Sequence, residues 1–209
     1  MPSSITLVVG SHRYSTWSLR AFLALKATGK AFDEVEVQLR QPDTPAAIRA
    51  YSPSGKVPLL IHDGVKVWDS LAICEYLAET FPAAGLWPAD RQARAMARAV
   101  SAEMHAGFAQ LRMLCPMDLG AGLTPLAEIP SEVAEDVARI RALWADCRRR
   151  FGQAGPYLFG PFTIADAMYA PVVTRFTTYA LPQDVESQAY CDAIWALPAL
   201  REWQEKGAG

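Results

Sequence analysis

The sequence predicts a small α/β domain followed by an all-helical domain. Short runs of β-branched or alternating apolar residues, typical of strands, occur only in the first third of the chain. A stretch rich in proline, alanine and glycine follows at 82–88, as is typical of a domain boundary. Beyond it, apolar residues recur with helical spacing to the end. We therefore expect an α/β domain over 1–81, a linker over 82–88 and a helical domain over 89–209.

The first third alternates strand and helix patterns. The run Ile5–Val9 predicts a buried strand, and a helix is expected from about Ser15 to Gly29, where glycine suits a helix end. Alternating apolar and polar residues over Phe32–Leu39 predict a second strand. It should lie parallel to the first strand, because a helix joins the two. A short helical piece is expected over Ala46–Tyr51.

A proline-led hairpin is the most informative segment. Its turn is the dipeptide Asp63-Gly64, and Pro58 should lie at a strand end because it lacks an N–H. If the bond before Pro58 is cis, Val57 offers its N–H and C=O to an extended peptide. The next helix opens on Asp69-Ser70, and its N-terminus attracts carboxylates. These features indicate a site for a small acidic peptide. The alternative is an ordinary hairpin–helix corner.

The remainder of the chain is expected to be helical. One continuous helix is predicted over Arg91–Leu114 and a loop over Gly120–Pro130. Thr163 and Asp166 have the spacing of a capping box, so Asp166 should serve folding rather than chemistry. Further helices are expected over 71–81, 130–151, 167–179, 187–195 and 198–206.

Composition argues against several functions. The net charge is −2, so no strong field draws the protein to nucleic acid or to an anionic membrane. No apolar run approaches the roughly 20 residues of a membrane span. The segment Met1–Ser4 lacks the features of a signal peptide, and a cytoplasmic location is expected. The cysteines form no CxxC pair and the histidines are scattered, so we expect reduced thiols and no metal site.

Several motifs occur in the order and spacing found in the glutathione transferases, which the chain resembles over essentially its whole length. They are Lys56-Val57-Pro58, Asp69-Ser70-Leu71-Ala72-Ile73, the linker, and Phe162-Thr163-Ile164-Ala165-Asp166. The resemblance implies a thioredoxin-like N-terminal domain with a C-terminal helical bundle. It also implies glutathione as co-substrate, a small electrophilic second substrate, a detoxifying role and a homodimer.

The segment Arg13–Arg20 resembles the bacterial serine-type enzymes and, more loosely, the zeta class of maleylacetoacetate isomerases. The zeta motif is Ser-Ser-Cys-Ser-Trp followed by two arginines separated by one residue. Trp17 and Arg20 match it, whereas Ser15 replaces the cysteine and Ser18 the first arginine. The two leading serines are replaced as well, which weakens the isomerase interpretation. Disulfide exchange is not expected, because this junction has no cysteine.

The resemblance also implies how the thiol of glutathione is activated. A free thiol has a pKa of ~8.5, so a hydroxyl donor and a helix N-terminus are needed to favour the thiolate. Ser15 is expected to be that donor in preference to Tyr14. The alternative for Ser15 is an ordinary N-cap. Arg20 is expected to pair with an acid inside the fold.

The remaining glutathione contacts follow from the matching motifs. Val57, next to Pro58, should pair through its backbone with the cysteinyl part. Ser70 should bind the γ-glutamyl carboxylate and Asp69 the ammonium group. Lys56 should meet the glycyl carboxylate, unless it is merely a solvated surface lysine.

The pocket for the electrophile is expected between the domains. His105, Phe108 and Arg112 lie on the helix predicted to line it, although such residues also fill ordinary helix cores. Arg175 could bind an acidic substrate, the alternative being a surface salt bridge. The leading interpretation is a glutathione transferase acting on small hydrophobic electrophiles, with peroxidase activity as a further possibility. The alternatives are a maleylacetoacetate-type isomerase and a non-catalytic binding or regulatory module.

Overall fold

A computed structural model describes residues 4–207 of the chain. Met1, Pro2 and Ser3, which contribute to the expected location, lie outside the described residues. The strands are β1 (Ile5–Gly10), β2 (Asp33–Val37), β3 (Leu59–His62) and β4 (Val65–Trp68). The α-helices are α1 (Thr16–Ala27), α2 (Thr44–Tyr51), α3 (Ser70–Thr80), α4 (Arg91–Ala106), α5 (Ala109–Leu114), α6 (Ser131–Phe151), α7 (Ile164–Thr178), α8 (Val185–Trp195) and α9 (Pro198–Gly207).

The four strands form one mixed sheet in the order β2-β1-β3-β4. β1 and β2 are parallel, as the helix between them predicts, and the other pairs are antiparallel. The hairpin is confirmed: Asp63 and Gly64 have φ values of 49° and 83°, the left-handed conformation that a two-residue hairpin turn requires. β2 is shorter than the predicted strand Phe32–Leu39.

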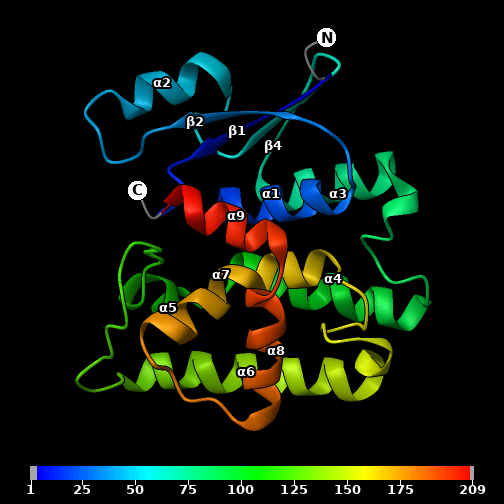
Figure 1. Ribbon diagram of the computed structural model, residues 1–209, viewed down its shortest axis with the longest axis vertical. Coiled ribbons are helices and arrows are strands. Elements are labelled where there is room, and N and C mark those ends of the chain that lie inside the picture. The colour runs from blue at the N-terminus through cyan, green and yellow to red at the C-terminus, as the bar shows by residue number, and fades with distance from the viewer. Residues whose placement is uncertain (1–3, 208–209) are drawn as a thin grey trace.

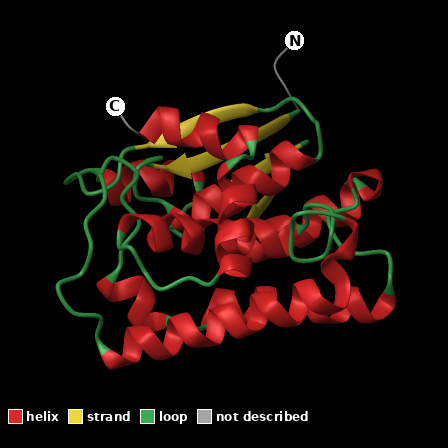
Figure 2. Ribbon diagram, turned by 60° about the horizontal axis from the view of Figure 1, so that its bottom comes forward, coloured by secondary structure: helices red, strands yellow, loops and turns green. Residues whose placement is uncertain are grey.

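Helices cover both faces of this sheet (Figure 1). Side chains of a strand alternate between faces, so Val8 packs with Ile48 beneath α2 while Leu7 and Val9 join the larger core on the other face. α1 and α3 cover that second face. The helical domain lies beyond α1, with the long α6 on its far side (Figure 2).

Helix α1 links the two halves of the protein. It packs on the sheet, on α3 and on α7, and every residue from Ser18 to Leu25 is buried. α7 is equally enclosed, with all residues from Ile164 to Phe176 buried. Helices that are covered on all sides belong to the core of a protein rather than to its surface. The contact between α1 and α7 therefore fixes the N-terminal domain on the helical one.

The last helix returns to the N-terminal domain. α9 lies beside α1 (Figure 1), and the indole of Trp203 donates a hydrogen bond of 2.8 Å to the carbonyl of His12. Lys26 pairs with Glu202 at 2.7 Å, and Lys206 pairs with Glu34 at 3.1 Å. Helix α9 thus contacts and stabilises the segment that precedes α1.

The predicted single helix over Arg91–Leu114 is wrong. It breaks between α4 and α5, where Phe108 has a φ of 57°. Gly107 ends α4 in an extended conformation, and a Cβ there would lie 2.8 Å from the carbonyl oxygen of Glu103. Because glycine has no Cβ, residue 107 can lie close to this carbonyl oxygen, and the chain can change direction between α4 and α5.

The predicted capping box at the start of α7 is confirmed. Asp166 is buried and accepts hydrogen bonds from the backbone N–H groups of Leu158 and Thr163 and from the hydroxyl of Tyr190. Burial raises the pKa of Asp166 to about 6, although these hydrogen bonds act in the opposite direction. Asp166 is therefore a structural residue of the helical domain.

Candidate active site

A cavity of about 300 Å³ opens where the hairpin, α3 and the two domains meet. Its lining residues are Trp17, Lys56, Val57, Pro58, Asp69, Ser70 and His105. The five residues predicted to bind glutathione are thus brought together, with one residue of the predicted electrophile pocket beside them. Polar groups and a concave shape make this cavity suited to a small polar ligand.

The segment before β3 lines the cavity. The Val57–Pro58 peptide bond is cis, and β3 begins only at Leu59. Val57 therefore lies outside the strand ladder and lines the cavity. This is the arrangement in which an extended peptide pairs with a free strand end.

Asp69 is held in a precise position at the start of α3. Its Oδ1 accepts hydrogen bonds from the N–H groups of Leu71 and Ala72, at 2.9 and 3.3 Å. Its φ of 72° with ψ of 132° is a backbone conformation that non-glycine residues rarely adopt and that clusters at functional sites. Oδ2 is directed elsewhere, 3.2 Å from Nε2 of His105.

Ser70 and His105 bring unused hydrogen-bonding groups to the same cavity. Within residues 4–207, the Oγ atom of Ser70 and the Nδ1 atom of His105 are buried and have no hydrogen-bond partner. A buried polar atom without a partner costs free energy, roughly 1–3 kcal/mol. A ligand that offers complementary atoms to these groups would offset that cost.

Ser15 lies just before α1 and is buried. Its hydroxyl makes no capping bond and instead donates to the hydroxyl of Ser18 at 2.7 Å. The Ser18 oxygen also accepts from the N–H of Gly10 at 3.0 Å. Ser15 is not one of the residues that line the cavity, although its near neighbour Trp17 is.

Two arginine side chains lie over the aromatic ring of Tyr14. The guanidinium of Arg40 lies 3.8 Å from the ring centroid and that of Arg13 lies 5.3 Å from it. Such contacts hold the ring by cation–π attraction. Tyr14, like Ser15, is absent from the lining of the cavity.

Trp17 is the lining residue that sequence reasoning used only as a family match. It stands in the first turn of α1 and meets His105 edge-on, with ring centroids 5.2 Å apart. The guanidinium groups of Arg20 and Arg112 lie 4.4 and 5.4 Å from its centroid. An aromatic residue two positions after a serine at a loop–helix junction was the available signal.

Arg20, Arg112 and Arg175 lie close enough to one another for their charges to interact. Arg20 is buried, and among the described residues its three guanidinium nitrogens have no hydrogen-bond partner. The predicted pairing of Arg20 with an acid is therefore wrong. Burial, together with the positive charges of Arg175 and Arg112, lowers the pKa of Arg20 to about 9.

Arg175 is not a surface residue, so the alternative of a surface salt bridge is wrong. It is buried, and its guanidinium donates to the carbonyl oxygens of Cys115 and Pro171, at 2.8 and 3.0 Å. Burial, reinforced by Arg112, lowers the pKa of Arg175 to about 10. Arg112 donates to the carbonyl of His105 at 3.2 Å, and Phe108 is buried at the start of α5.

Comparison with known protein families agrees with this architecture. Residues 14–80 match the glutathione S-transferase N-terminal domain and residues 130–205 match the glutathione S-transferase C-terminal domain. The chain belongs to the glutathione S-transferase family.

The chain is similar to relatives named maleylacetoacetate isomerase and to relatives named glutathione S-transferase, such as a probable glutathione S-transferase of Solanum tuberosum, to which it is 36% identical over 86 residues that cover 41% of this chain and 39% of the relative. The chain is 36% identical over 104 residues to a probable maleylacetoacetate isomerase of Caenorhabditis elegans, covering 50% of this chain and 48% of the relative. It is 42% identical over 100 residues to a maleylacetoacetate isomerase of Rhizobium meliloti (strain 1021), covering 44% and 45%. The aligned regions thus span less than half the length of these relatives.

A solved structure matches over nearly the whole chain. It is the crystal structure of a glutathione transferase homologue from Burkholderia GL BGR1 with bound glutathione. The TM-score is 0.71 and the identity 27%, covering 97% of both chains.

The described part of the chain offers no metal centre and no membrane span. Across residues 4–207, no three histidine, cysteine, aspartate or glutamate side chains are grouped as metal ligands would be. No helix within that range is both long and apolar enough to cross a bilayer.

Proposed function

We propose that this protein is a glutathione transferase that adds the glutathione thiolate to small hydrophobic electrophiles. The observation that carries the proposal is the cavity in which Val57, Asp69 and Ser70 converge, with a buried Ser70 hydroxyl that has no partner in residues 4–207. The glutathione bound to the Burkholderia homologue supports the same ligand. Glutathione is a co-substrate in this proposal.

Each end of glutathione has a counterpart in the cavity. The Val57 backbone pairs with the cysteinyl unit, as an added strand would. Ser70 and the N-terminus of α3 receive the γ-glutamyl carboxylate, and Asp69 receives the ammonium group. Lys56 lies at the cavity and meets the glycyl carboxylate.

The chemical step requires a thiolate at neutral pH. Lowering a thiol pKa by two units takes about 2.7 kcal/mol of preferential stabilisation of the anion. In our proposal the hydroxyl of Ser15 turns from Ser18 to the sulfur and acts with the N–H groups at the start of α1. Tyr14 is the alternative donor, although Arg40 and Arg13 already lie over its ring.

Turnover separates this enzyme from a non-catalytic binding module. Purified protein would be assayed with glutathione against aryl halides, hydroperoxides and maleylacetoacetate analogues. Conjugation of an aryl halide supports the transferase, and hydroperoxide reduction adds peroxidase activity. Binding of glutathione without turnover of any compound in the panel would favour the binding module.

The arginine group supports a second candidate, a maleylacetoacetate-type isomerase. Arg20, Arg112 and Arg175 lie close to Trp17 or to each other, and the guanidinium of Arg20 has no hydrogen-bond partner among residues 4–207. Arg112 is the one of these three that is not buried, so in this proposal it meets the acidic electrophile. The relatives named maleylacetoacetate isomerase support this candidate. Isomerisation of a maleylacetoacetate analogue in the same panel, with no net consumption of glutathione, would establish it.

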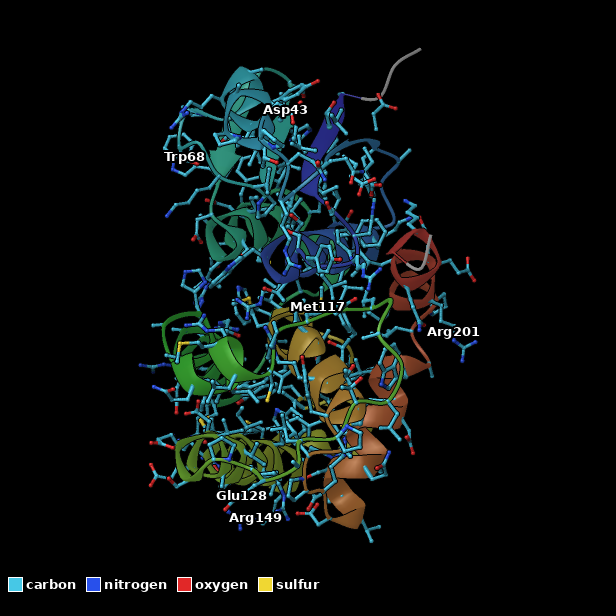
Figure 3. All side chains as sticks on the ribbon, turned by 90° about the vertical axis from the view of Figure 1, so that its left-hand side faces the viewer. Asp43, Trp68, Met117, Glu128, Arg149 and Arg201 are labelled. Atoms are coloured by element: carbon cyan, nitrogen blue, oxygen red, sulfur yellow. The ribbon has the colours of Figure 1, made fainter. Side chains whose placement is uncertain are left out.

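We also propose a homodimer, with the outer edge of the N-terminal domain as part of its interface. Helix α3 is left out of this proposed interface, because its Cys74 and Leu77 are buried within the chain's own core. The edge strand β4 instead exposes Val65 and Trp68, and Figure 3 places Trp68 at the outer side of the domain. Exposed apolar side chains on an unpaired edge strand favour association. Light scattering should give twice the 22.9 kDa of one chain, and a mass near one chain would contradict the dimer.

A cytoplasmic, detoxifying role completes the proposal. All four cysteines are free and buried, which suits a reducing compartment where glutathione is abundant. Fractionation of cells expressing the full protein would test the location. The detoxifying role predicts that cells from which the gene is deleted lose resistance to an electrophile that the enzyme conjugates.

A further inference from the structure

His105 extends from the helical domain into the proposed glutathione site. It stands in the last turn of α4, where its Nε2 lies 3.2 Å from Oδ2 of Asp69 at the start of α3. Both residues line the cavity. The carboxylate assigned to the ligand's ammonium group is therefore already in contact with an imidazole from the other domain.

The two oxygens of Asp69 have different roles. Oδ1 is occupied by the N–H groups of Leu71 and Ala72, so it fixes the carboxylate to α3. Oδ2 faces His105 and is the oxygen left for a ligand. A carboxylate oxygen can accept two hydrogen bonds, so a neutral imidazole and an ammonium group can share Oδ2. A protonated imidazole would instead neutralise the carboxylate.

Other charged groups around His105 leave Asp69 as its acidic partner. Lys56 lines the same cavity from the segment before β3, and Arg112 of α5 donates to the His105 carbonyl. From α1, the edge of Trp17 packs against the ring, with the guanidinium of Arg20 over that indole. A positive charge on His105 would thus compete with the ligand's ammonium group for Asp69, the carboxylate among the described residues that line this cavity.

We propose that His105 controls recognition of the γ-glutamyl ammonium group: neutral, it orients Asp69 for the ligand, and protonated, it takes the ligand's place. The inference rests on the proposed binding of glutathione. Histidine is the side chain that changes its charge between pH 5 and 8. Affinity for γ-glutamyl ligands should therefore fall when an imidazole in contact with Asp69 gains a proton.

Calorimetric titration with S-methylglutathione tests this, because a blocked thiol removes the ionisation of sulfur from the measurement. We expect the wild-type protein to bind roughly tenfold more weakly at about pH 5.5 than at about pH 8, a loss typical of one charged hydrogen bond. His105→Gln keeps a neutral donor and should bind equally well at both pH values. His105→Arg carries a permanent charge and should bind weakly at both. His62→Gln, a histidine outside the cavity, is the matched control and should retain the wild-type pH dependence.

A second ligand tests the wild-type protein without a substitution. The analogue in which a glutaryl group replaces γ-glutamyl lacks the ammonium, so its affinity should not change with pH in this way. An equal pH dependence for both ligands would overturn the inference, as would pH dependence that survives in His105→Gln. Failure of S-methylglutathione to bind the wild-type protein at about pH 8 would instead overturn the proposed function itself.

Discussion

The hydroxyl of Ser15 donates a hydrogen bond of 2.7 Å to the hydroxyl of Ser18, one turn further along the chain. Ser18 also accepts a hydrogen bond from the N–H of Gly10. A hydroxyl has a single donor. Ser15 must therefore exchange Ser18 for the sulfur of glutathione if it is to stabilise a thiolate, and this exchange separates the roles of the two serines.

Ser15→Ala should lower turnover much more than it lowers affinity for glutathione, because the lost interaction is with the thiolate. The apparent pKa of the bound thiol should rise towards the ~8.5 of a free thiol. Ultraviolet titration of the bound thiolate measures this directly. Full activity in Ser15→Ala together with loss of activity in Tyr14→Phe would make Tyr14 the donor.

Ser18→Ala should give the opposite pattern. The variant leaves the N–H of Gly10 buried without its acceptor, at a cost of roughly 1–3 kcal/mol in unfolding free energy. The bound thiol should keep its lowered pKa, because the donor of Ser15 is released rather than removed. Urea unfolding and the same thiolate titration check the two halves of the prediction. A thiol pKa raised as far as in Ser15→Ala would show that Ser18, not Ser15, matters for the thiolate.

Ser70→Ala should weaken glutathione binding by roughly 1–3 kcal/mol, since a charged group loses a hydrogen bond. The folded protein should lose little stability, because the Ser70 hydroxyl has no partner among the described residues. Calorimetric titration and thermal unfolding measure the two effects separately. If affinity is unchanged, the γ-glutamyl carboxylate has been placed wrongly.

Asp166→Asn should destabilise the protein more at about pH 4 than at about pH 7. The folded-state pKa of Asp166 is raised from 3.8 to about 6, so its contribution to stability is fully present below pH 3.8 and is lost as the pH rises through about 6. The difference in unfolding free energy between wild type and variant should shrink by up to about 3 kcal/mol over this range. Urea unfolding at both pH values measures it. A difference that grows with pH would mean that the capping hydrogen bonds outweigh the cost of burying the charge.

Arg20→Met should leave the unfolding free energy unchanged or raise it. Replacing a buried charge that lacks an acidic partner with an apolar side chain of similar length removes a desolvation cost. Arg20→Lys is the matched variant: it keeps the charge and loses the planar stacking on Trp17, so it should be less stable than both. Strong destabilisation of Arg20→Met in urea would contradict this account and point to a bound anion or water on the guanidinium.

Local patterns were sufficient to predict most of the fold. The Asp63-Gly64 turn, the proline before β3 and the Thr163–Asp166 capping box each depend on residues close together in the chain, and the structure confirms them. The break at Gly107 was missed because its helical pattern continues on both sides. The close packing of Gly107 against the carbonyl of Glu103, which leaves no room for a Cβ, is visible only in the structure.

The site was predictable only in part, for a related reason. Lys56, Val57 and Ser70 come from the hairpin and the helix that follows it, so adjacency in sequence brings them together. The contact of His105 with Asp69 joins two domains, and neither residue's neighbours in the sequence indicate it. Arg20 is likewise buried without a hydrogen-bond partner because α1 packs against elements that are distant in the chain, such as α7.

The central claim is that the cavity at Val57, Asp69 and Ser70 binds glutathione, and thermal unfolding with added glutathione tests it most directly. Ligand at ~100 times its dissociation constant should add about 2.7 kcal/mol to the unfolding free energy. The melting temperature of the wild-type protein should therefore rise with glutathione concentration. In Ser70→Ala the same rise should require a higher concentration of glutathione. A melting temperature indifferent to millimolar glutathione would contradict the account.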